Sequence, residues 1–132
     1  MGAFSHYLES ALINATLKNT AYTSPVTVYL ARFTADPTDA NTGTEVSGGS
    51  YARQSIAFGS ITTNTNGSTV SNSAQVTFPT ATAIWGTVTH YGIYDASTVG
   101  NLLYHDAWSV SRTVNNGDTA IVATAGLTLQ LD

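Results

Sequence analysis

The chain has 132 residues, a formal net charge of −4 and no cysteine. This length predicts a single domain over residues 1–132, with a core large enough to need no disulfide bridges. Its four cationic residues are scattered along the chain, which excludes the clustered cations of a nucleic-acid-binding protein. The absence of cysteine excludes thiol catalysis and zinc–thiolate sites.

Charged residues make up only 9% of the chain, whereas the hydrophobic share of 42% is ordinary for a globular protein. Threonine, serine, asparagine and glycine replace the missing charges. Neutral hydroxyl groups lose water at an interface at lower cost than lysine or glutamate, so this surface is typical of a protein that packs against others. The first residues lack a signal-peptide pattern, and no apolar run approaches the roughly 18 residues of a membrane span.

The first segment, residues 4–19, has its apolar residues at helical spacing and predicts one amphipathic helix. A helix of this length is only marginally stable alone, so it must pack on another surface. That surface is either its own sheet, which we favour, or a neighbouring subunit. On the second interpretation Phe4, Tyr7, Leu8 and Leu12 are interface candidates.

After Pro25 the pattern changes to the period of two that is typical of strands. The predicted fold is all-β: one antiparallel β-sandwich of about seven strands over residues 26–131, jelly-roll or immunoglobulin-like, with the short helix before it. Residues 36–43 form a turn-rich loop. Apolar groups on both faces of 85–95 favour a central strand. The predicted strands cover residues 26–33, 51–58, 70–78, 85–95, 102–110, 119–123 and 127–131.

Oxygen-bearing side chains gather in and after the first long loop, at Asp36, Asp39, Asn41 and Glu45. Calcium binds to several such oxygens on a flexible loop. The spacing differs from that of an EF-hand, and Asp and Asn are common in turns for backbone reasons alone. We therefore predict a structural turn, with no metal and no cofactor.

Two groups of residues contain the residue types of a catalytic site. His90, His105 and Asp106 contain the residue types of a hydrolytic triad, but the chain has no G-x-S-x-G motif. Asp95 and Asp106 could form a glycosidase carboxylate pair, although Asp95 also begins a turn. Structural roles are favoured throughout, and the sequence predicts a protein that is not an enzyme.

Five aromatic residues lie in two neighbouring predicted strands: Trp85, Tyr91, Tyr94, Tyr104 and Trp108. They favour a core of cross-strand aromatic pairs. The alternative is an exposed group that stacks on sugar rings or forms an interface hot spot.

A separate pair follows the Gly48-Gly49 turn. Tyr51 and Arg53 are same-face neighbours in a predicted strand and are interface candidates. The stem of Arg53 could also simply cover the surface of the sheet.

Four segments together resemble a family of small virion structural proteins from tailed phages and prophages, often labelled tail fibre proteins. They are the opening helix with residues 23–30, then 44–54, 85–95 and 101–104. The resemblance covers nearly the whole chain and implies a place in the virion, but no catalytic residues.

Two positions in the virion fit this resemblance. We favour a capsid decoration protein that binds the major capsid protein, because a compact chain without repeats differs from an extended fibre. The alternative is a tail, baseplate or fibre component that binds a host receptor. Other virion proteins are the expected partners, together with copies of the chain itself in a homo-oligomer, with a trimer favoured.

Overall fold

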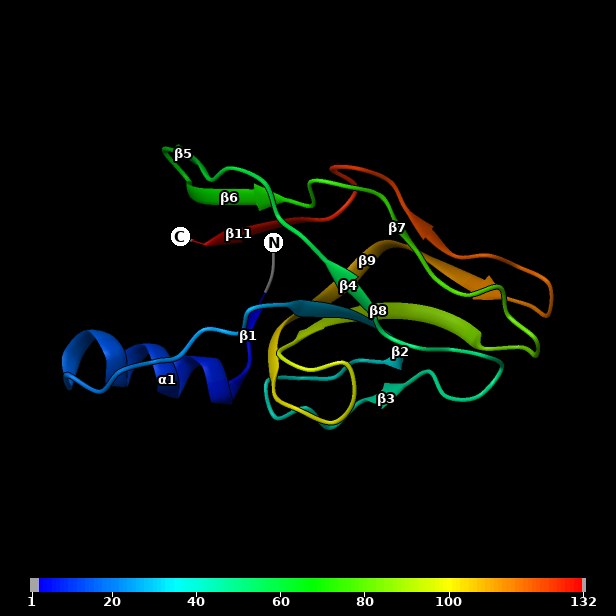
Figure 1. Ribbon diagram of the computed structural model, residues 1–132, viewed down its shortest axis with the longest axis horizontal. Helices are drawn as coiled ribbons and strands as arrows, with labels where there is room; N and C mark the ends of the chain where they lie inside the picture. The colour runs from blue at the N-terminus through cyan, green and yellow to red at the C-terminus, as the bar shows by residue number, and fades with distance from the viewer. Residues whose placement is uncertain (1–2, 132) are drawn as a thin grey trace.

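The computed structural model describes residues 3–131 and is mostly β, with one helix near the N-terminus (Figure 1). This confirms the predicted antiparallel β class and the early helix. The helix is shorter than predicted, because it begins after Ser5 and ends at Leu17. The elements are β1 (Ala3–Phe4), α1 (His6–Leu17), β2 (Val28–Ala35), β3 (Thr44–Glu45), β4 (Gln54–Ile56), β5 (Thr62–Asn64), β6 (Gly67–Ser71), β7 (Val76–Thr77), β8 (Gly86–Tyr94), β9 (Leu102–Val114), β10 (Ile121–Val122) and β11 (Thr128–Leu131).

The strands form three antiparallel sheets. The largest has the order β1-β9-β8-β2-β3, with β4 also paired to β2. A second sheet pairs β10 with β7, and a third has the order β11-β6-β5. The central position predicted for residues 85–95 is confirmed, because β8 lies between β9 and β2. The jelly-roll or immunoglobulin-like sandwich is not confirmed and stays a prediction.

The predicted strand over 70–78 is two strands in different sheets, β6 and β7. Asn72 lies between them and is almost fully buried. Its amide nitrogen donates to the carbonyls of Ala74 and Ala123, and its amide oxygen accepts from the backbone N–H of Leu127. These bonds replace a strand ladder at this point, so the chain can turn from one sheet to the next.

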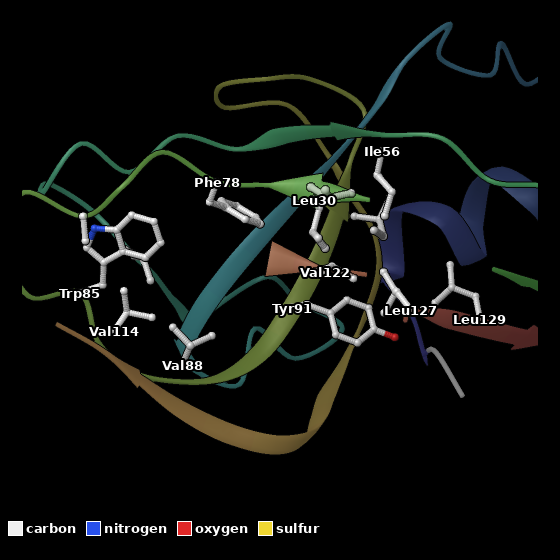
Figure 2. Close-up of a cluster of buried hydrophobic side chains, with 14 residues drawn as sticks. Leu30, Ile56, Phe78, Trp85, Val88, Tyr91, Val114, Val122, Leu127 and Leu129 are labelled. Atoms are coloured by element: carbon white, nitrogen blue, oxygen red, sulfur yellow. The ribbon is translucent and has the colours of Figure 1, made fainter. Parts of the chain in front are cut away.

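The main core lies between the largest sheet and the two smaller ones (Figure 2). Leu30 of β2 and Val88 and Tyr91 of β8 contribute from the larger sheet, and Val122 and Leu129 contribute from β10 and β11. On the opposite face of the large sheet, a second small cluster consists of Ala31, Phe33, Tyr94 and Leu102. Strand β8 therefore has buried side chains on both faces, as its sequence predicts.

A bulge in β9 interrupts its pairing with β8. His90 pairs with Ala107, whereas Val88, two residues earlier, pairs with Arg112. Between these two pairs β8 has one residue, whereas β9 has four: Trp108 and the three residues that follow it. Bulges bend a strand and re-aim its side chains, and they are common beside functional sites.

Helix α1 projects from one end of the β-body (Figure 1). Ser5 caps it: the Ser5 Oγ accepts from the backbone N–H of Leu8 and donates to the carbonyl of Leu102 in β9. The backbone N–H of Ser5 also donates to the Leu103 carbonyl at 2.9 Å. The start of the helix is thus fixed to the sheet. Over residues 3–131, no helix has the length and apolar character needed to cross a membrane.

Candidate functional site

The acidic loop serves as structure. Asp36 accepts the backbone N–H of Thr38, and Asp39 lies 2.7 Å from the Nε2 atom of His105. Asn41 accepts a hydrogen bond from the hydroxyl of Tyr94. Asp36 also lies 3.8 Å from the Nδ1 atom of His105, so the oxygens of this loop contact backbone and side chains of the chain itself. Within residues 3–131, no group of three or more His, Cys, Asp or Glu residues is arranged to hold a metal ion.

The histidines and carboxylates that resemble catalytic residues are not arranged as a triad. The Nε2 atom of the His105 imidazole lies 2.7 Å from Asp39 of the acidic loop. The Nδ1 of His90 lies 2.8 Å from the hydroxyl of Thr89. Asp95 accepts both the backbone N–H and the side-chain amide of Asn101, which closes the loop between β8 and β9. These contacts hold loops and strands together.

The predicted aromatic group belongs mainly to the core. Trp85, Tyr91 and Tyr94 are buried, and Tyr104 and Trp108 are half-buried against the core. The indole N–H of Trp85 donates to the carbonyl of Gly49 at 2.9 Å. An exposed platform for stacking on sugars is therefore absent from these residues, and the core interpretation is correct.

Tyr51 and Arg53 lie within contacts of the chain itself. The Tyr51 hydroxyl donates to Glu45 Oε1 at 2.8 Å, and burial, together with the charge of Glu45, raises the pKa of this phenol. Arg53 forms two hydrogen bonds of 2.8 Å with the Glu45 carboxylate. Its guanidinium stacks at 3.6 Å on the ring of Tyr94, not on Tyr51. Their role as contacts for a partner stays a prediction, and the structure gives both an internal role.

The four interface candidates on the N-terminal segment differ in exposure. Phe4 packs edge-on against Tyr104 at 5.4 Å, and Leu8 is buried. Leu12 is half-buried, and Tyr7 is 43% exposed. The first two therefore fix the helix to its own sheet, as we favoured. Their contact with a neighbouring subunit stays a prediction.

The outer face of α1 carries apolar residues that the sequence reasoning did not select. Ile13 is 52% exposed and Leu17 is 78% exposed, and the two lie one helical turn apart. Only Leu8 is buried among the residues of the helix. A short helix with so little burial gains little stability from its own chain. Helix α1 and its exposed Ile13 and Leu17 are called the arm below.

A cavity of about 200 Å³ opens where the β9 bulge faces β10 and the chain that follows it. Two of its ten lining residues are arginines, Arg32 of β2 and Arg112 of β9, and none is acidic. Trp108 and Ser109 of the bulge also line it, and the remaining lining residues are apolar or glycine. The net charge of the chain is −4, so a cavity with two cations and no carboxylate is locally positive. We call it the arginine pocket.

Arg32 is the unusual residue of this pocket, because it is only 6% exposed. Its guanidinium lies 4.7 Å from the ring centroid of Phe78 and 5.2 Å from that of Trp108. Its Nε has no hydrogen-bond partner among residues 3–131, and neither has the buried Nε1 of Trp108. Burial lowers the pKa of Arg32 to about 10, while the nearby Tyr51 raises it slightly. The protein thus buries a cation against aromatic rings without pairing it to a carboxylate.

The sequence reasoning missed this pocket because it treated the arginines as scattered. Arg32 and Arg112 are 80 positions apart, and the β2–β8–β9 pairing brings their strands to one sheet. One signal was available. Val28, Leu30 and Arg32 share one phase of a strand, and this alternation puts an arginine on the apolar face of the strand.

A second cavity, of about 390 Å³, lies between β6 and β11 on one side and the large sheet on the other. It is lined by apolar residues such as Phe58, Ile61, Leu103 and Leu129, and none of its lining residues is charged. Tyr104, which contacts Phe4, also lines it, so this apolar groove lies beside the root of the arm.

A family model described as podophage GP4 fiber I protein gp80 matches residues 3–130. A search of curated proteins finds no match. The family match confirms the resemblance seen in the sequence. It supports the fibre alternative and gives no support to capsid decoration, so the argument from compact size was misleading about position. The chain belongs to the podophage fibre I protein family and is a structural protein of the phage virion.

Proposed function

We propose that this fibre protein contacts the host cell surface through its β-body and joins other virion proteins through its N-terminal arm. The observation that carries the proposal is the separation of two features along the molecule. Helix α1 projects from one end of the β-body, whereas β7 and the end of β9 lie towards the other end (Figure 1). Arg112, near the end of β9, lines the arginine pocket. A fibre subunit needs such a polarity, with attachment at one end and recognition at the other.

The arm supports the attachment half of the proposal. Its outer face exposes Ile13 and Leu17, and its charged side chains are few. Burial of exposed apolar side chains under a partner is favourable, because it removes their surface from water, and it would also stabilise a marginally stable helix. Tyr7 and Leu12 belong to the same helix and extend the surface that a virion protein would cover.

The arginine pocket supports the recognition half. It is a concave site with a few polar groups on a β-scaffold, which is the usual form of a small-ligand site. Its size suits one group of a surface polymer better than a protein partner. The buried aromatic residues keep its walls in place.

Adsorption competition tests the proposal. The purified protein is added to the bacterial strain on which its phage grows, and the rate of phage adsorption is measured. We expect the protein to bind the cells and to slow adsorption in proportion to its concentration. If circular dichroism shows that the protein is folded and it still does not bind to the cells, the receptor role is refuted.

A second measurement concerns position and assembly. Immunogold labelling of intact virions is expected to decorate the tail region. Light scattering of the purified protein tests the predicted trimer directly. Label spread over the icosahedral head would contradict the proposed attachment.

A further inference from the structure

We infer that the arginine pocket binds an oxyanion, a carboxylate or phosphate group carried by a polysaccharide of the host surface. This inference rests on the proposed receptor role and specifies the chemistry of its ligand. It is drawn from the two arginines, the unpaired donors and the absence of acidic residues around one cavity.

Burial of the Arg32 guanidinium has a free-energy cost. Burying a cation without a partner is unfavourable, because the protein interior solvates charge poorly. The rings of Phe78 and Trp108 compensate only part of this cost, since a cation–π contact is weaker than a hydrogen-bonded ion pair. An anion in the pocket would supply the missing partner. The folded protein therefore holds a cation in advance of its ligand.

The second step is the charge that surrounds the pocket. The chain has four cationic residues. Arg53 is neutralised by Glu45, and Lys18 follows the end of α1. The other two, Arg32 and Arg112, both line the arginine pocket. A ligand with a negative group is therefore favoured there over a neutral one.

The third step is the size and shape of the cavity. A volume of about 200 Å³ is below the roughly 300–1,000 Å³ of pockets that enclose a whole drug-sized ligand, so the cavity accommodates a small group and not a folded partner. Arg112 is exposed at the opening, whereas Arg32 lies deeper. Guanidinium groups bind carboxylate and phosphate through paired hydrogen bonds. A sugar unit bearing such a group could insert the anion while the polymer continues outside.

Nuclear magnetic resonance titration of the full chain provides a direct test. The probes are a galacturonate oligomer, inorganic phosphate and a neutral galactose oligomer. The indole N–H signals of the two tryptophans give an internal comparison. Trp108 lines the pocket and has no acceptor, whereas Trp85 is bonded to Gly49. We expect the Trp108 signal to shift with an anionic probe and the Trp85 signal to stay in place.

Three variants complete the test. Arg112→Gln removes the exposed cation and is expected to weaken anion binding by roughly tenfold or more, as loss of a charge-assisted hydrogen bond does. Lys18→Gln makes the same change of charge on the far side of the molecule and should leave binding unchanged. Arg32→Met, which keeps an apolar stem over the rings, should abolish binding.

The outcomes distinguish a carboxylate ligand from a phosphate ligand. They also distinguish failure of the anion site from failure of the receptor role. Binding of galacturonate alone identifies a carboxylate, and binding of phosphate alone identifies a phosphate group. Equal binding of the neutral oligomer, no binding of either anion, or an unchanged affinity in Arg112→Gln would overturn the inference. If labelled protein still adsorbs to host cells in those cases, the receptor role stands without the anion. If it does not adsorb at all, the receptor role itself fails.

Discussion

Arg53 and Glu45 form a doubly hydrogen-bonded ion pair that joins three separate parts of the chain. Glu45 belongs to β3, and Arg53 also donates to the carbonyls of Ala96 and Val99 in the loop between β8 and β9. Burial disfavours the charge of Arg53, but the hydrogen bonds and charge of Glu45 outweigh it and raise the pKa of the guanidinium overall.

The first prediction follows from this pair. Glu45→Gln is expected to lower the free energy of unfolding by about 2 kcal/mol, less than for a fully buried pair because Glu45 is partly exposed. Urea denaturation measures the change. Glu9→Gln, on the arm, is the control and should have little effect. A loss below about 0.5 kcal/mol would show that the pair contributes no more than an ordinary surface salt bridge.

The second prediction concerns Ser5, whose hydroxyl serves both the helix and the sheet. Ser5→Ala removes the cap of α1 and leaves the buried carbonyl of Leu102 without this donor. We expect a loss of about 1–3 kcal/mol in the free energy of unfolding. In Ser5→Ala, the rate of amide hydrogen exchange should also increase over the wild-type rate more in α1 than in β8. Thr16→Ala, at the other end of the helix, is the control, and an equal effect there would contradict the special role of Ser5.

Local patterns in the sequence predicted the helix and most strands, but not the short strands β1, β3 and β5, and not how distant elements meet. The period of two correctly indicated β2 and the central strand β8. It joined β6 to β7, because nothing in a single sequence reveals that the side chain of Asn72 will donate to the carbonyl of Ala123, far along the chain. The β9 bulge was missed for a related reason: a bulge is defined by the partner strand.

The function, like the fold, was only partly predictable from the sequence. The resemblance carried by several segments correctly identified a virion protein, while size and composition suggested the capsid. Architecture does not determine where a protein is placed in a particle. The arginine pocket depends on β2 and β9 both pairing with β8, which brings Arg32 and Arg112 to one cavity, so composition alone could not reveal it.

The third prediction is that Arg32 lowers the stability of the empty protein. Burial lowers the pKa of its guanidinium in the folded state to about 10, well below the usual range for arginine, so folding carries a cost while the group is charged. This cost is fully present while Arg32 is protonated in both the folded and the unfolded state, and it declines as the pH rises above about 10. Arg32→Met should therefore raise the free energy of unfolding at pH 7 by about 1–3 kcal/mol, as measured by urea denaturation.

A matched comparison makes this prediction sharp. Arg112→Gln alters an exposed cation and should change stability by less than about 0.5 kcal/mol. An anion that binds in the arginine pocket should raise the free energy of unfolding of the wild type but not of Arg32→Met. If Arg32→Met is instead destabilised by more than about 1 kcal/mol, Arg32 is a structural residue of the core and not one held for a ligand.

The last prediction separates attachment from folding. Ile13→Ser together with Leu17→Ser removes the apolar outer face of the arm, which contributes little to the fold because both residues are exposed. The free energy of unfolding should change by less than about 1 kcal/mol, while incorporation of the protein into phage particles falls sharply in a complementation assay. Val99→Ser alters an apolar residue of the β8–β9 loop that is more exposed than Ile13 or Leu17, and this variant should incorporate normally. Normal incorporation of the double variant would show that the arm is not the attachment surface, and attention would turn to the apolar groove beside its root.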